Sequence, residues 1–147
     1  MAEARTISAL NRLLTILSRS FPMYLTYAPP WSPRGDEDQA LVALRHIVAD
    51  EEALCERIAE TILDLGGQIN VGEFPMQYTD LHDLSVDFVV RLARDYQKQD
   101  IAAIERCVDD LRLAPVAKAL AQEAIGMAKG HLESLEELDG SESLQPA

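Results

Sequence analysis

The chain has 147 residues, of which 48% are apolar and 26% are charged, and its formal net charge is −12. This length is typical of one domain, so the sequence predicts a single folded unit that spans the whole chain. A strongly acidic protein is poorly suited to nucleic acid or anionic lipid, because both need a cationic protein surface. We therefore expect neither nucleic acid nor a membrane as a partner.

Cysteine use and the N-terminus bear on the cellular compartment. The two cysteines, Cys55 and Cys107, lie in helix-like stretches with no metal-type ligand nearby, which indicates free thiols in a reducing compartment. The first residues lack a basic segment followed by an apolar run, and no window approaches the ~18 uncharged apolar residues of a membrane-spanning helix. These features predict a cytoplasmic protein.

Apolar residues at helical spacing predict a first helix over residues 6–28, with a bend at Pro22. Pro29, Pro30 and Pro33 then predict a short linker that carries the only tryptophan, Trp31. A carboxylate at Asp36 or Asp38 would favour the start of the next helix.

The second helix is expected over residues 38–65, because apolar residues there alternate in steps of four and three. Glu51 interrupts this apolar seam. Gly66 and Gly67 should end the helix, and residues 68–80 lack a helical period and form a connection long enough to cross a bundle. The remaining members of the seam are Leu44, Val48, Cys55, Ile58, Ile62 and Leu65.

Two further helices are expected over residues 83–112 and 116–138, with a frayed tail over 140–147. Asp100 falls on the apolar stripe of the third helix, and His131 falls on that of the fourth. Short connections join the helices within each half of the chain. The sequence therefore predicts an all-α, four-helix bundle of two antiparallel helix pairs joined by a long crossover.

Phosphate-binding loops, nucleophile elbows and Cys-x-x-Cys pairs are absent from the sequence, so polar groups on the apolar seams are the candidate site. An ionised carboxylate in a bundle core is costly unless it is paired or bound to a metal. Glu51 therefore needs a partner. Two alternatives remain open at this point, a core hydrogen bond to His131, Tyr24 or Tyr96, or ligation of a metal.

Three sequence strings carry a resemblance to a known family. Residues 10–14 (LNRLL), 49–52 (ADEE) and 130–136 (GHLESLE) resemble the first, second and last helices of the ferritin-like superfamily, and of bacterioferritin in particular. The resemblance spans about residues 7–140. It implies a four-helix bundle and, in the family, a di-iron centre in which two helices each supply a Glu and two each supply a Glu-x-x-His.

The resemblance also implies that this di-iron site is degenerate. Glu51 and His131 match ligands of the family, and Asp95 falls near the third-helix glutamate. The other ligand positions fall on residues that cannot bind iron, because carbon side chains offer no donor. Those residues are Leu17, Leu54 and Ala128.

Two functions follow from this interpretation. The first is a homodimeric binding or structural module that has lost ferroxidase chemistry, needs no cofactor and is not an enzyme. The alternative is a metal-dependent oxidase, or a peroxide- or iron-handling protein, with a single iron or manganese at Glu51, Asp95 and His131.

Overall fold

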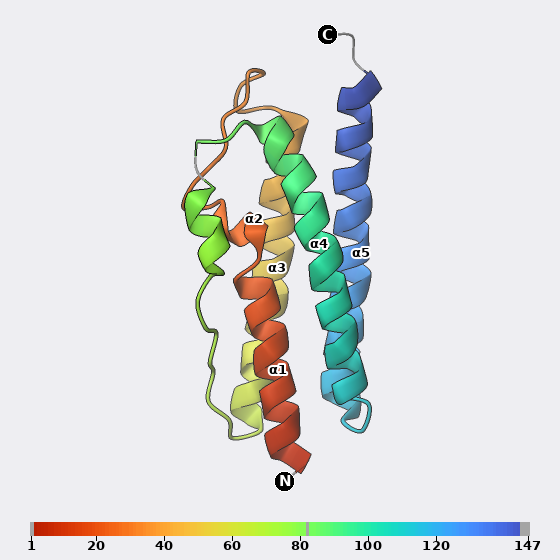
Figure 1. Ribbon diagram of the computed structural model, residues 1–147. Helices are drawn as coiled ribbons and strands as arrows, with labels where there is room; N and C mark the ends of the chain where they lie inside the picture. Colours follow the sequence, from red (N-terminus) through yellow and green to blue (C-terminus); the bar gives the residue numbers. More distant parts are fainter. Residues whose placement is uncertain (1, 82, 145–147) are drawn as a thin grey trace.

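The computed structural model describes residues 2–81 and 83–144, and helices make up the regular structure of this part of the chain (Figure 1). This confirms the all-α class. No helix among the described residues has the length and apolar character needed to cross a membrane. The elements are α1 (Ala2–Ser18), α2 (Phe21–Tyr24), α3 (Gln39–Asp64), the 3-10 helix η1 (Met76–Asp80), α4 (Val86–Asp110) and α5 (Pro115–Leu144).

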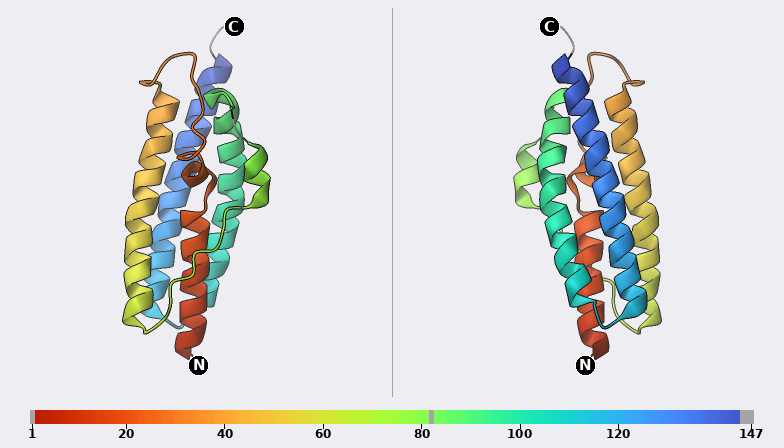
Figure 2. Two further views of the ribbon diagram at one scale, coloured as in Figure 1. Left: turned by 90° about the vertical axis from the view of Figure 1, so that its left-hand side faces the viewer. Right: turned by 90° about the vertical axis from the view of Figure 1, so that its right-hand side faces the viewer.

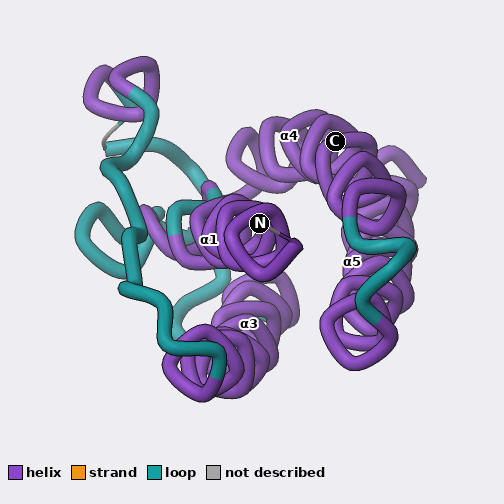
Figure 3. The backbone as a smooth tube through the Cα atoms, turned by 90° about the horizontal axis from the view of Figure 1, so that it is seen from below, coloured by secondary structure: helices purple, strands orange, loops and turns teal. Residues whose placement is uncertain are grey.

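The four long helices form two antiparallel pairs. α1 runs against α3, and α4 runs against α5, while α3 and α4 point in the same direction (Figure 1). The connection from α3 to α4 returns along the height of the bundle and passes across α1, with η1 about midway (Figure 2). Seen along the bundle axis, the four helices surround one common interior (Figure 3). The predicted long crossover between helix pairs is confirmed.

The predicted first helix is broken in two. α1 begins at Ala2 and ends at Ser18, and the short α2 follows. The Ser20 hydroxyl accepts a hydrogen bond from the Met23 amide over 3.3 Å, so Ser20 caps α2. Pro22 lies in the first turn of α2, where the missing N–H costs no helical hydrogen bond. The break turns the Ser20 side chain into the bundle, where it is fully buried.

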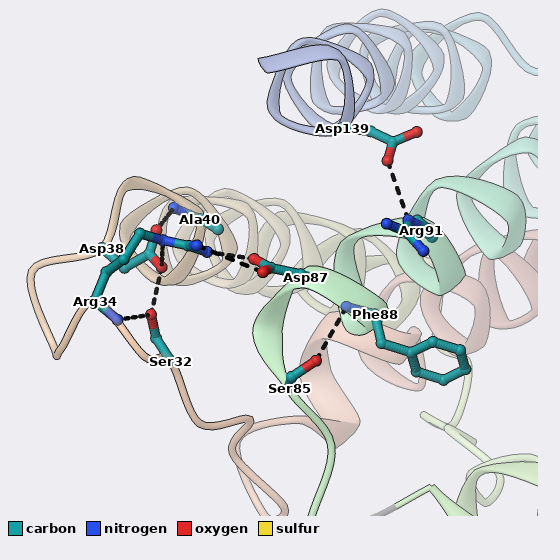
Figure 4. Close-up of polar contacts among 9 residues, drawn as sticks. All are labelled: Ser32, Arg34, Asp38, Ala40, Ser85, Asp87, Phe88, Arg91 and Asp139. Carbon is teal, nitrogen blue, oxygen red and sulfur yellow. Dashed lines mark hydrogen bonds and ion pairs between the residues drawn. The ribbon is translucent and has the colours of Figure 1, made fainter. Parts of the chain in front are cut away.

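The proline-rich linker is fastened to the start of α4. The Trp31 amide donates to the Leu84 carbonyl over 3.1 Å, and the Val86 amide donates to the Trp31 carbonyl over 2.8 Å. Arg34 lies between Asp38 and Asp87, with 2.8 Å from its Nε to Asp38 Oδ2 (Figure 4). Of the two carboxylates expected at the start of the second helix, Asp38 caps α3.

The remaining helix ends differ by a few residues from the predictions. α3 ends at Asp64, and Gly66 adopts a φ of 79°, as expected of a glycine that closes a helix. α4 begins at Val86, three residues later than predicted, because Ser85 caps it. The sequence predicted a frayed tail over residues 140–147. This prediction is wrong for residues 140–144, because α5 continues to Leu144. Residues 145–147 lie outside the described part of the chain.

The interior contains two apolar clusters, one above the other along the bundle axis. The first cluster lies toward the N-terminus of α1 and the turn between α4 and α5. The second cluster lies toward α2 and the starts of α3 and α4. Members of the first cluster include Leu10, Leu13, Leu17, Leu54, Ile58, Ile104, Leu120 and Ala128, and members of the second include Phe21, Leu44, Ile47, Tyr78, Val90, Ala93 and Leu135.

Candidate functional site

A layer of buried polar side chains separates the two apolar clusters. On α3, α4 and α5, and at the junction of α1 with α2, the chain passes from one cluster to the other across a polar residue. We call this set the polar layer. Its buried members are Ser20 between Leu17 and Phe21, Glu51 between Ile47 and Leu54, Gln97 between Ala93 and Ile104, and His131 between Ala128 and Leu135. Asp100, which also lies between Ala93 and Ile104, is partly buried and is counted with them.

Glu51 lies in the centre of the polar layer, with 3% of its surface exposed. Its Oε1 accepts a hydrogen bond from the Ser20 hydroxyl over 2.8 Å. The sequence predicted that Glu51 would be buried, and that is confirmed. The predicted partners, His131 or a tyrosine hydroxyl, are wrong, because the break after α1 places Ser20 against Glu51.

The surroundings of Glu51 favour its protonated form. Burial raises the pKa of Glu51 well above its ordinary value, and the hydrogen bond from Ser20 only partly opposes this effect. The negative charges of Asp100 and Asp50 raise the pKa further. A neutral carboxyl group at this position is consistent with an interior that offers Glu51 no cationic partner among the described residues.

Asp100 is the second carboxyl group of the polar layer. Burial raises its pKa from 3.8 to about 7. Its position on the apolar stripe of the third predicted helix was the signal for it in the sequence, although it was not predicted as a site residue. Asp100 acts on Glu51 electrostatically, so α3 and α4 each contribute one carboxyl group to the same layer.

His131 is held by the neighbour of Glu51 in the sequence. Its Nε2 lies 2.8 Å from Oδ2 of Asp50, and the side chains of His131 and Asp50 are 11% and 57% exposed. Its Nδ1 is buried and has no hydrogen-bond partner among the described residues. The donor in this contact depends on the tautomer of the ring, and Nδ1 lies on the buried side of the ring.

Gln97 closes the layer between α4 and α5. It is 4% exposed, and its Nε2 donates to the Ala128 carbonyl over 3.0 Å. Gln97 was not predicted from the sequence. It lies about one helical turn after Ala93, which is buried, and this spacing could have indicated that Gln97 faces the interior. The bond satisfies a buried amide and fixes the register of the two helices.

Asp95 lies outside this arrangement. Its side chain is 59% exposed, and Oδ1 lies 3.4 Å from Nε of Arg94. Asp95 is two residues from both Ala93 and Gln97, which are buried, and two residues turn a helix by roughly 200°. The structure therefore brings Glu51 and His131 into one layer and leaves Asp95 on the outer surface.

Aromatic rings form one wall of the site. Tyr78, from η1 on the crossover, is 4% exposed, and its ring centroid lies 5.1 Å from that of Tyr96 and 5.3 Å from that of Phe21. Burial, followed by the charge of Asp100, raises the pKa of Tyr78. The aperiodic segment 68–80 gave no signal that it would place a ring in the core.

Three positions that the resemblance assigns to iron ligands are apolar and buried. Leu17, Leu54 and Ala128 are 2%, 3% and 2% exposed, and all three belong to the first apolar cluster. Among the side chains that the structure describes, no group of three or more His, Cys, Asp or Glu residues is placed so that it could hold a metal ion.

Comparison with known proteins bears on the fold. No protein-family model matches the sequence, and no curated protein matches it. The structure is similar to that of a ferritin-like, diiron-carboxylate protein from Bacillus anthracis str. Ames, with a TM-score of 0.75 over 95% of this chain and 98% of that one. This chain has the ferritin-like fold. The two sequences are 18% identical, so the likeness shows the fold of this ferritin-like chain and carries no function over to it.

Proposed function

We propose that this ferritin-like chain carries no di-iron ferroxidase centre and acts by binding, as a structural or interaction module. The observation that supports the proposal is the burial of Leu17, Leu54 and Ala128 in the first apolar cluster, at positions that the family resemblance assigns to metal ligands. Side chains of carbon and hydrogen cannot ligate iron, and these three are packed in the apolar core.

The polar groups that remain support the same proposal, because they already bind one another. Glu51 accepts from Ser20, and His131 pairs with Asp50. A carboxyl group with a raised pKa offers less negative charge to a divalent cation. These contacts therefore support a structural role for the polar layer, in which hydrogen bonds fix the register of the helices, over a role as a metal site.

The alternative, one iron or manganese at Glu51, Asp95 and His131, is not favoured. It requires the Asp95 carboxylate beside the other two side chains, whereas Asp95 lies on the outer surface of α4. Without Asp95, this ligand set keeps only the imidazole of His131 and the carboxyl group of Glu51, which are too few donors to offset the dehydration of such a cation.

We propose further that the protein is cytoplasmic and forms a homodimer. Cys55 and Cys107 are both free thiols, which suits a reducing compartment. Closed twofold dimers are the commonest assemblies of soluble proteins. Association through the outer faces of the bundle is the binding activity that we propose for the chain.

Metal content and iron oxidation test this proposal. Protein purified without a metal-binding tag should contain well under one iron or manganese per chain by elemental analysis. Ferrous iron added in air should oxidise at the rate seen in buffer alone. Glu51→Gln is the matched variant, because it keeps the size of the side chain and removes the ligand, and it should behave as the wild type does in both assays.

Two results would overturn the proposal. Two irons per chain, with fast oxidation that stops after two equivalents and is lost in Glu51→Gln, would establish a ferroxidase centre. One metal per chain, lost in both Glu51→Gln and His131→Ala, would establish the single-metal alternative.

A further inference from the structure

A groove lies between α3 and α5 at the end of the bundle that holds the turn from α4 to α5. Its volume is about 510 Å³, which is within the range of pockets that bind specific groups. These two helices are neighbours in the view along the bundle axis (Figure 3). The lining includes Arg57, Glu60 and Thr61 from α3 and Val116, Ala119 and Leu120 from α5.

Two large apolar side chains project from the same end of the molecule. Leu113, in the turn, is 88% exposed, and Val116, in the first turn of α5, is 72% exposed. Isolated exposed apolar residues are common on proteins. Here, however, Val116 also lines the groove, so the projecting residues and the hollow belong to one continuous surface.

This surface carries a negative charge in the groove and a positive charge beside the projecting residues. In the groove, Arg57 Nη1 forms an ion pair with Glu123 Oε1 over 2.6 Å. Glu60, which also lines the groove, forms no ion pair with the described residues. Beside Leu113, the Arg112 side chain is 68% exposed, and its ion-pair contact with Asp109 is 3.9 Å long. One part of the surface therefore offers a cation next to an apolar projection, and the other offers a carboxylate next to an apolar hollow.

We propose that a second copy of this chain fills the groove, with its Leu113 and Val116 against Leu120 and its Arg112 beside Glu60. The fit is reciprocal, because each copy carries both the projection and the groove, and a twofold axis would use each of them twice. A stable interface buries on the order of 1,200–2,000 Å² in total, so the groove is its centre and the adjoining faces of α3 and α5 surround it.

This inference rests on the proposed binding role and names its partner. Metal content tests the absence of a metal centre, whereas the oligomeric state tests the homodimer and this interface. A dimer that tolerates the interface variants would overturn the interface alone and leave the proposed homodimer standing. Two chains of charge −12 repel one another, so the association is to be measured near physiological salt, where charges more than about 8 Å apart are screened.

Sedimentation velocity over a range of concentrations, with the wild type and surface variants, tests the interface. The wild type should form a dimer. Leu113→Asp should raise the dimer dissociation constant by about tenfold or more, because it places a charge at the centre of the interface. Glu60→Arg and Arg112→Glu should each weaken the dimer, and the double variant should recover much of the loss, because it reverses the pair.

Met76→Asp is the matched control, since Met76 is 85% exposed on η1, away from α5 (Figure 2). It should leave the dimer unchanged. All of these side chains lie on the surface, and circular dichroism should report an intact helical fold for each variant. A wild type that stays monomeric at every concentration would overturn the proposal. A dimer that tolerates Leu113→Asp and both charge reversals would overturn it too, because another face would then be the interface.

Discussion

Ser20 donates a hydrogen bond of 2.8 Å to Glu51, and both residues are almost completely buried between the two apolar clusters. The bond joins the cap of α2 to the middle of α3. A buried carboxyl group in a helical bundle is costly without a partner, and the break after α1 supplies one. The local structure of the chain near Ser20 and the chemistry of the core are therefore linked.

Ser20→Ala should lower the free energy of unfolding by roughly 1–3 kcal/mol, because it removes a partner of buried Glu51 and the cap of α2. Ser18→Ala is the matched control. The Ser18 hydroxyl only bonds back to the Leu14 carbonyl within α1, at 2.6 Å, and its loss should change stability little. Urea unfolding of both variants measures the difference. Equal stabilities would show that the Ser20 bond contributes nothing.

Asp100 should make stability depend on pH. Its pKa is about 7 in the folded protein, against 3.8 as the ordinary value, so the unfolded chain loses this proton first as pH rises. The stability that protonated Asp100 contributes is complete below pH 3.8 and is lost as pH rises toward 7. Relative to Asp100→Asn, the wild type should lose roughly 1–3 kcal/mol over this window.

Unfolding of wild type and Asp100→Asn across this pH window gives the comparison. Asp95→Asn is the control, because Asp95 lies in water on the same helix. A difference between wild type and Asp100→Asn that stays constant with pH would mean that Asp100 titrates as it does in the unfolded chain. A difference of opposite slope would mean that a cation stabilises its charged form.

Ile47→Ala and Val48→Ala should differ in cost. Ile47 is 2% exposed and belongs to the second apolar cluster, so its truncation should cost roughly 2–5 kcal/mol. Val48 is only partly buried and should cost less. Chemical denaturation of the two variants measures this. A greater loss in Val48→Ala would place the seam of α3 where the sequence predicted it.

The two cysteines should react slowly in the folded protein. Burial, followed by the charges of Glu51 and Glu52, raises the pKa of Cys55 to about 12, and burial raises that of Cys107. Because the thiolate is the reactive form, a thiol reagent at mildly alkaline pH should modify both residues far faster after unfolding. Immediate modification of both thiols in the folded state would contradict their placement.

Much of the fold could be predicted from the sequence, because glycine, proline and the apolar spacing mark helix ends directly. Leu44, Ile58 and Ile62 were predicted on the apolar seam of the second helix and are buried. Val48 was also predicted and is only partly buried, since Ile47 takes the inward position at that turn. A strict heptad drifts relative to a helix of 3.6 residues per turn, which accounts for this shift by one residue.

The site could be predicted only in part. Glu51 and His131 were found because they interrupt apolar seams. Their partners Ser20 and Asp50 were not, since one depends on a helix break and the other lies half-exposed at the edge of the layer. Asp95 was placed by the register of the family resemblance, whereas the buried polar residue of α4 is Gln97 and the partly buried one is Asp100.

Anomalous diffraction from crystals soaked in ferrous or manganous salt tests most directly whether the polar layer holds metal. We predict no peak between Glu51 and His131, and Glu51 still within hydrogen-bond distance of Ser20. Two peaks bridged by the Glu51 carboxylate, with the Ser20 bond broken, would contradict the account.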